Sequence, residues 1–154
     1  MHSERYTIAR FRKKYADQVL NLIDSGLKDV GAIPRGDELI NDEDLLNIQN
    51  FYSNGSRFWI ALREKAVIGT VAVKDAGNGE AFLKRMFCLP RYHGKGLGQE
   101  LLNTAISFAR MRCYTRMLLT THKSMERARR FYEKNGFEQT GFRKDLFYYE
   151  LTDL

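Results

Sequence analysis

The segment Leu89-Pro90-Arg91-Tyr92-His93-Gly94-Lys95-Gly96-Leu97-Gly98-Gln99 decides how this chain folds. It joins an apolar segment typical of a strand to a stretch, Leu97 to Ala109, whose apolar residues recur at helical spacing. Glycines at a helix start let backbone N–H groups converge, and the helix N-terminus adds partial positive charge. The segment therefore predicts a phosphate or pyrophosphate site where a strand leads into a helix.

The common nucleotide-binding patterns do not fit this segment. A Walker loop requires a Lys-Ser or Lys-Thr pair after its last glycine, and none follows here. A dinucleotide fingerprint requires a glycine where Gln99 stands, and an acidic residue about 20 positions further on, for which there is no clean candidate. Two interpretations stay open: another phosphate ligand, or a glycine-rich turn that binds nothing.

Outward from this segment, hydrophobic periodicity predicts further strands and helices. Strands are expected near residues 6–11, 58–62, 67–73, 81–89, 116–121, 137–141 and 146–151. Helices are expected near 16–27, bracketed by Gly26 and Gly31, from a cap at Asn41 to Tyr52, near 97–109, and around Ala128 to Tyr132 with a stop at Asn135-Gly136. The second helix would bury Leu45, Leu46, Ile48, Phe51 and Tyr52. The sum is a mixed α/β or α+β fold with six or seven strands and about four helices.

Length and composition bound the class of protein. The 154 residues are 44% hydrophobic and 29% charged, which fits a single domain over residues 1–154 and excludes wholesale disorder. No apolar run is long enough for a membrane span, and the first residues lack the apolar stretch of a secretory leader. Cys88 and Cys113 are too few for a disulfide framework. We therefore expect a cytoplasmic protein that does not act on a membrane.

The charge is positive overall and unevenly distributed. A formal net charge of +6 favours an anionic partner: nucleic acid, anionic lipid or a phosphorylated small molecule. A basic cluster consists of Lys123, Arg127, Arg129 and Arg130, and an acidic patch consists of Asp37, Glu38, Asp42, Glu43 and Asp44. A chain with both regions could hold an anionic ligand and a cationic one together, although a solvated basic helix face and an acidic helix start also explain them.

Two motifs carry a family resemblance. His93-Gly94-Lys95-Gly96-Leu97-Gly98, after the strand Leu83–Pro90, resembles the coenzyme-A loop of the GNAT superfamily of N-acetyltransferases. Phe131-Tyr132-Glu133-Lys134-Asn135-Gly136-Phe137 resembles the second signature of that family, and the likeness extends from about Tyr6 to the C-terminus. Three residues depart from the pattern: His93 replaces the usual Gln or Arg, Met125 a frequent asparagine, and Phe82 a frequent catalytic glutamate.

The resemblance implies a mostly antiparallel sheet and transfer of an acetyl group from acetyl-CoA to a primary amine of a small molecule, peptide or protein, by direct attack in a ternary complex. Backbone N–H groups around Phe87 and Cys88 would stabilise the oxyanion. Asp37 and Glu38 would border the acceptor cleft and could attract a cationic amine. The expected coenzyme-binding residues are Met86, Phe87, Cys88, His93, Gly94, Lys95, Gly96, Leu97, Gly98, Gln99 and Arg127.

The resemblance also implies a general acid. Tyr132 would protonate the departing thiolate, although Ala128, Phe131 and Tyr132 share the spacing of a core face. The general base stays open. Glu80 shares a strand face with Phe82 if the strand is regular and is otherwise a solvated turn residue, His122 could reach the cleft, and water could accept the proton.

Other chemistries find less support in the sequence. Cys88 as the nucleophile of a ping-pong scheme lacks a paired histidine. His2, His93, His122 and the cysteines lack metal-ligand spacing, so no metal is expected. One rival function is a nucleic-acid-binding module, suggested by Arg110, Arg112, Arg116 and Tyr114 but without a recognised motif, so we expect no nucleic acid partner. Another is a non-catalytic coenzyme-A sensor, suggested by Phe82. The strand Phe147–Leu151 could pair across a homodimer.

Overall fold

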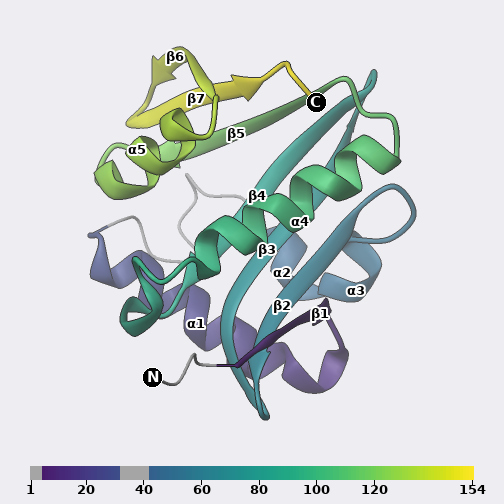
Figure 1. Ribbon diagram of the computed structural model, residues 1–154, viewed down its shortest axis with the longest axis vertical. Helices are drawn as coiled ribbons and strands as arrows, with labels where there is room; N and C mark the ends of the chain where they lie inside the picture. Colours follow the sequence, from purple (N-terminus) through teal and green to yellow (C-terminus); the bar gives the residue numbers. More distant parts are fainter. Residues whose placement is uncertain (1–4, 32–41) are drawn as a thin grey trace.

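The computed structural model describes residues 5–31 and 42–154, which build one seven-stranded sheet with helices on both faces (Figure 1). The strands are β1 (Thr7–Arg10), β2 (Arg57–Arg63), β3 (Ala66–Gly77), β4 (Glu80–Cys88), β5 (Arg116–His122), β6 (Glu138–Arg143) and β7 (Leu146–Leu151). The helices are α1 (Ala16–Asp29), α2 (Glu43–Leu46), α3 (Ile48–Phe51), α4 (Leu97–Met111) and α5 (Glu126–Lys134), with 3-10 turns at Lys13–Tyr15 and Pro90–Tyr92.

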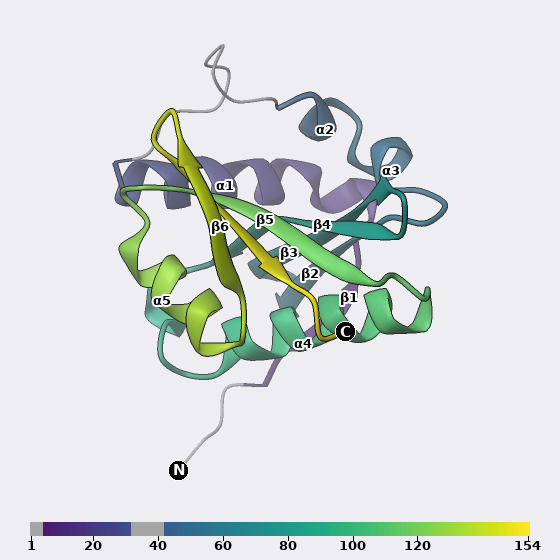
Figure 2. The same ribbon diagram turned by 90° about the horizontal axis from the view of Figure 1, so that it is seen from above.

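The helices form two layers around the sheet. Figure 2 shows α1, α2 and α3 on one face, and α4 and α5 on the other. The α4 face has its own core, in which Leu83 and Leu101 are buried, and the α1 face has a second core around Ile23 and Ile60. Because side chains alternate along a strand, each of the central strands contributes to both cores.

The sheet opens in its middle. The strand order is β1-β2-β3-β4-β5-β7-β6, and every pair is antiparallel except β4 with β5. That parallel pair is short, because only Glu80–Phe82 lie opposite Arg116–Leu118. Beyond Phe82, β4 pairs with β3 alone and β5 with β7 alone. A gap therefore separates β4 from β5 over the second half of β4.

An irregularity in β4 lies beside this gap. Arg85 has a φ of +54, and the register with β3 shifts between Thr70 and Ala72. The Thr70 hydroxyl donates to the Arg85 carbonyl at 2.7 Å, which satisfies a group that the regular ladder would have paired. Such a bulge turns neighbouring side chains away from the positions that strict alternation predicts.

The mixed architecture and its seven strands agree with the sequence-based expectation, but the segment after Asn41 differs from it. Asn41 lies outside the described residues. The expected single helix is two four-residue helices, because Asn47 adopts φ −151 and its side chain accepts from the Asn50 N–H to start α3. The prediction that Leu46 is buried is wrong, since Leu46 is 83% exposed. Gly26 lies inside α1, which continues to Asp29.

Candidate active site

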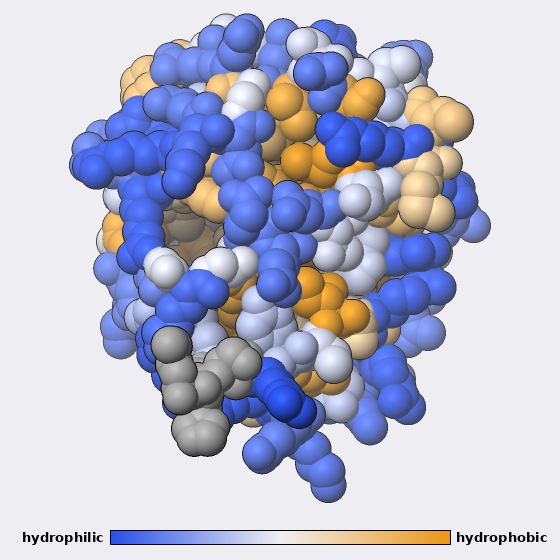
Figure 3. Space-filling model, in the orientation of Figure 1, coloured by the Kyte–Doolittle hydropathy of each residue, from blue (hydrophilic) through white to orange (hydrophobic). Residues whose placement is uncertain are grey.

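A cavity of about 1100 Å³ occupies the gap between β4 and β5. The end of α1, the strand β4, the glycine loop, α5 and the turn between β6 and β7 contribute to its walls. Figure 3 shows a hollow between α5 and the start of α4, with apolar surface inside and hydrophilic side chains around it. The cavity brings together most of the residues expected from the sequence: Met86, Phe87, Cys88, His93, Gly94, Gly96, Gly98, Gln99, Arg127 and Tyr132.

The glycine loop presents uncovered backbone to this cavity. Gly94 and Gly96 adopt φ values of +75 and +89, a conformation that side chains rarely tolerate, and a Cβ at either would meet nothing within 4 Å. Gly98 has no positive φ, and a Cβ there would meet only ordinary contacts, the nearest being Met86 at 3.7 Å. The backbone conformation therefore requires the first two glycines, whereas Gly98 leaves room on the cavity side.

The N-terminus of α4 has no side-chain cap among the described residues. Its cap residue is Gly96, which has no side chain to accept from the first N–H groups of the helix. Those groups and the helix dipole favour an anion at this point. The loop and the helix start thus have the features that a phosphate or pyrophosphate group requires.

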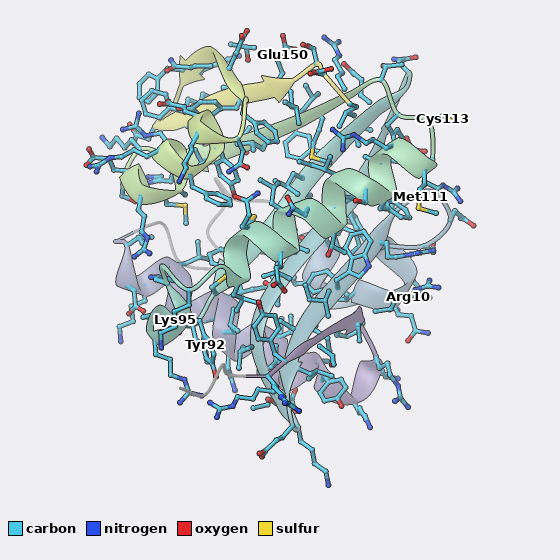
Figure 4. All side chains as sticks on the ribbon, in the orientation of Figure 1. Arg10, Tyr92, Lys95, Met111, Cys113 and Glu150 are labelled. Atoms are coloured by element: carbon cyan, nitrogen blue, oxygen red, sulfur yellow. The ribbon has the colours of Figure 1, made fainter. Side chains whose placement is uncertain are left out.

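Two expected loop residues lie outside the cavity lining. Lys95 is exposed on the loop (Figure 4) and Leu97 is 1% exposed within the α4 core. Only their backbone groups belong to the loop surface. Gln99 lines the cavity, but its amide donates to Asn103 at 2.9 Å and to Asn135 at 2.8 Å, so its side chain ties α4 to the end of α5.

Of the four residues of the basic cluster, Arg127 lines the cavity and the other three do not. Arg129 stacks 4.1 Å over the Phe147 ring, Arg130 pairs with Glu126, and Lys123 pairs with Asp145. Arg127 lines the cavity and donates to Nδ1 of His93 at 3.0 Å, while Nε2 of His93 lies 3.1 Å from the Cys88 carbonyl. Arg127 is therefore the member of this cluster best placed to meet an anion at the loop.

Tyr132 is a buried phenol that lines the cavity. The residue is 8% exposed, and its ring packs edge-on against Phe131 and Phe137. Its hydroxyl makes no hydrogen bond within the described part of the chain. Burial raises the pKa of Tyr132, and the nearby Cys88 adds to the rise. The phenol therefore keeps its proton at neutral pH and can donate it to a group beside it that becomes basic during a reaction.

Cys88 is also held in its protonated form. Burial raises the pKa of this thiol to about 11, although Arg127 acts in the opposite direction. A thiol with such a pKa is a poor nucleophile at neutral pH.

The backbone of Cys88 matters more than its thiol. The N–H of Leu89 donates to Ile68 on β3, and successive N–H groups of a strand point to opposite sides, so the Cys88 N–H points into the gap. The contact between His93 and the Cys88 carbonyl, which lies on that same side, agrees with this orientation. The cavity thus contains a backbone donor in the same region as the Tyr132 hydroxyl.

The two candidate bases differ in their position. Glu80 pairs with Arg116 at the first residue of β4 and is not among the cavity-lining residues, so the structure does not bring it to Tyr132. His122 does line the cavity, and its Nδ1 accepts from the Ser124 N–H at 3.1 Å. That contact leaves the proton of a neutral imidazole on Nε2, so His122 offers the cavity a donor.

The sequence reading missed a charged network behind β4. Arg85 donates to both carboxylate oxygens of Asp44, at 3.0 and 2.8 Å, and pairs with Asp42 at 3.2 Å. Asp44 is 1% exposed and also accepts from the Tyr52 hydroxyl at 2.6 Å. These two members of the acidic patch therefore pair with the protein itself, whereas Asp37 and Glu38 lie outside the described residues. The sequence indicates only that β4 carries charge, because Lys84-Arg85 interrupts an otherwise apolar strand.

Two negative findings hold for residues 5–31 and 42–154. No three His, Cys, Asp or Glu side chains gather as metal ligands would, and the expectation of a metal-free protein stays a prediction. No helix in these ranges is long and apolar enough to cross a bilayer.

Comparison with known proteins gives consistent matches. The model of the acetyltransferase (GNAT) family matches residues 26–137. A Xenopus tropicalis protein named N-acetylaspartate synthetase is 34% identical over 103 residues, which are 64% of this chain and 37% of that protein. The chain spans between about a third and a half of the length of the curated relatives that it matches.

Solved structures extend the comparison to nearly the whole chain. An acetyltransferase from Streptococcus agalactiae superposes with a TM-score of 0.85 at 27% identity, covering 96% of this chain and 98% of that one. The PaiA N-acetyltransferase from Thermoplasma acidophilum, in complex with coenzyme A, superposes with a TM-score of 0.76, covering 96% of this chain and 99% of that one. At 20% identity, the second likeness shows the fold alone.

Proposed function

The chain belongs to the acetyltransferase (GNAT) family, and on this premise we propose that it transfers an acetyl group from acetyl-CoA to a primary amine. One observation carries the proposal: the uncapped start of α4 and the cavity-lining groups of Cys88 and Tyr132 share one continuous cavity. The names of the relatives and the coenzyme A complex of a structural neighbour support it. Residues 1–154 as one such domain stay a prediction.

Acetyl-CoA would supply an acetyl group activated as a thioester. We assign its phosphates to the N–H groups of Gly94 and of residues 96–99, and to Arg127, because these are the anion-binding groups at the loop end of the cavity, whereas the Lys95 N–H donates to the Tyr92 carbonyl. Met86, Phe87 and Gly98 would line the part of the cavity that holds the section of acetyl-CoA between its phosphates and its thioester. The protein's task at the reacting carbonyl is to orient it and to stabilise the charge that develops on its oxygen.

The Cys88 N–H is the donor that we assign to this oxygen. The neutral amine nitrogen forms the new C–N bond, the C–S bond breaks, and the sulfur leaves with the electron pair. Tyr132 gives its proton to that sulfur, and the proton lost by the amine nitrogen restores the phenol. Atoms and charge are therefore conserved between the reactants and the products. An ammonium acceptor must first lose a proton, and we assign this proton to water, since Glu80 is not at the cavity.

Thermal unfolding and turnover together test this function. We expect about 1 mM acetyl-CoA to raise the unfolding midpoint by several degrees if the Kd is on the order of 10 μM, whereas ATP and NAD at the same concentration have little effect. Free thiol should then appear only when an amine is added. Binding without turnover over a broad panel of amines would favour a coenzyme-A sensor, and no shift in a folded protein would contradict the proposal.

A further inference from the structure

The cavity has a second basic region, away from the glycine loop. Lys84 on β4 and Arg143 and Lys144 at the turn between β6 and β7 all line it. Lys84 lies on the α1 face of the sheet, because its neighbour Leu83 is buried in the α4 core and its electrostatic neighbours are Asp44, Asp42 and Lys74. Figure 2 shows the turn between β6 and β7 reaching the same side of the sheet as α1.

Under the proposed function, this second basic region is the part of the cavity that remains for the acceptor. The phosphates are assigned to the loop and α5, and the reacting groups of Cys88 and Tyr132 lie in the gap. The amine must approach from the side of β4 that the coenzyme does not occupy, which is the side of Lys84. Among the described residues that line this end, Asp29 at the end of α1 is acidic, so the cations outnumber it.

Lys84 and Arg85 are adjacent cations in different situations. Arg85 has hydrogen-bonded carboxylate partners in Asp44 and Asp42. Lys84 is half-buried and has neither a hydrogen bond nor an ion pair among the described residues, and its ammonium lies 5.8 Å from the centre of the Phe82 ring. The two carboxylates beside it are hydrogen-bonded to Arg85, so the ammonium of Lys84, which lines the cavity, feels their charge without a direct contact to either of them.

A half-buried ammonium is costly unless an anion accompanies it. Burial lowers the pKa of Lys84, and Arg85 and Lys74 lower it further, while Asp44 and Asp42 act in the opposite direction. An anionic group on the acceptor would restore the favourable environment of the ammonium. Arg143 and Lys144, both exposed at the rim, would attract such a group from solution.

Resting on the proposed function, we propose that the acceptor is a small amine that also carries a carboxylate, and that Lys84 binds this carboxylate while the amine faces the gap between β4 and β5. The carboxylate takes no part in the bond changes: the C–N bond forms at the amine nitrogen and the C–S bond breaks as described above. Lys84 thereby selects amino acids and related zwitterions over simple amines, because only the former present an anion at the required place.

The test compares matched acceptors that differ only at the carboxylate. Phenylalanine, tyrosine and lysine are each assayed against their carboxamides and their decarboxylated amines, at saturating acetyl-CoA. We expect kcat/KM at least about tenfold higher for the acid than for its carboxamide with the acceptor that fits the pocket, because a charge-assisted contact is lost in the amide. The amide is a stringent reference, since its amine is less basic and more of it is neutral.

Substitutions at Lys84 test whether this residue binds the carboxylate of the acceptor. Lys84→Met should lower kcat/KM for the acid by about tenfold and leave the amide within about twofold, and Lys84→Arg should recover part of the loss. Lys65→Met, an exposed lysine outside the cavity, is the matched control. Thermal unfolding and the acetyl-CoA shift are measured for each variant, so that a misfolded protein is recognised.

Each outcome bears on one of the two proposals. Equal or better use of the amides and amines, an equal loss on all acceptors in Lys84→Met, or no turnover of any acid while acetyl-CoA still binds would overturn the carboxylate inference and leave the coenzyme site standing. Absence of an acetyl-CoA shift in the folded wild-type protein would instead contradict the proposed function.

Discussion

Arg127 donates a hydrogen bond to Nδ1 of His93 at 3.0 Å, and the same imidazole lies 3.1 Å from the Cys88 carbonyl through Nε2. An arginine can only donate, so Nδ1 is the acceptor and Nε2 carries the proton toward Cys88. One side chain thus links α5, the glycine loop and β4, all three of which line the cavity. The family pattern has Gln or Arg where His93 stands, and the imidazole here makes two polar contacts.

We expect His93→Ala to raise the KM for acetyl-CoA by about threefold to tenfold with little change in kcat, because the two hydrogen bonds position the loop and Arg127 but touch no reacting atom. His93→Gln, which can still donate and accept, should recover part of the loss. Lys95→Ala, in the same loop but outside the cavity lining, is the matched control. A larger effect in Lys95→Ala than in His93→Ala would contradict this role for His93.

Much of this arrangement follows from local sequence rules. The glycine loop, the amphipathic helix after it and the stop at Asn135-Gly136 were predictable, because each depends on residues near one another in the chain. The gap between β4 and β5 was not, because it depends on where a parallel pairing between segments 36 residues apart, Glu80 and Arg116, comes to an end.

The carboxylate partners of Arg85 on β4 could not be predicted from the sequence for the same reason. Asp42 and Asp44 resemble an ordinary acidic helix start in sequence, and only the fold brings Arg85 from 41 residues away to Asp44. Glu80 is the opposite case, because the sequence suggested a place in the site and the fold puts the residue away from the cavity. Strand alternation places it on the same face as Phe82, but its position at the beginning of β4 puts it at the closed end of the pair, beside Arg116.

The buried pair of Asp44 and Arg85 should make the fold sensitive to acid. Burial alone would raise the pKa of Asp44, but the hydrogen bonds and charge of Arg85 outweigh burial and hold the pKa below its usual value. A lowered folded-state pKa means that the stabilisation is complete above the unfolded value of about 3.9 and is lost as the pH falls through the folded value. We expect the free energy of unfolding to decline in that range.

Asp44→Asn removes this dependence and leaves the Arg85 charge without its buried partner, so we expect a loss of about 3 kcal/mol at pH 7 by denaturant unfolding. Asp42→Asn is the matched control, because Asp42 is more exposed, at 14% against 1%, and its contact with Arg85 is longer. Two results would contradict this role for the Asp44–Arg85 pair. One is an equal loss of unfolding free energy in the two variants, and the other is a decline of that free energy at low pH in Asp44→Asn that is the same as in the wild type.

Cys88 should be unreactive in spite of its place in the cavity. With a pKa of about 11, roughly one thiol in a few thousand is ionised at pH 7.5. Iodoacetamide at that pH should modify the exposed Cys113 first, as mass spectrometry of the intact protein and its peptides would show. Cys88→Ala should keep kcat within about threefold, since only the backbone N–H is assigned a role. An acetyl group trapped on Cys88, together with an inactive Cys88→Ala, would establish a covalent route instead.

Tyr132→Phe is the sharpest test of the chemical step. The hydroxyl makes no hydrogen bond within the described residues, and Phe keeps the ring contacts with Phe131 and Phe137, so we expect the unfolding midpoint and the acetyl-CoA shift to change little. The rate of thiol release should fall by about 100-fold or more, because the departing sulfur loses its proton donor. Tyr148 is another phenol that lines the cavity, and the rate of thiol release should fall far less in Tyr148→Phe. Equal rates in wild type and Tyr132→Phe would show that water protonates the sulfur and that Tyr132 is a packing residue.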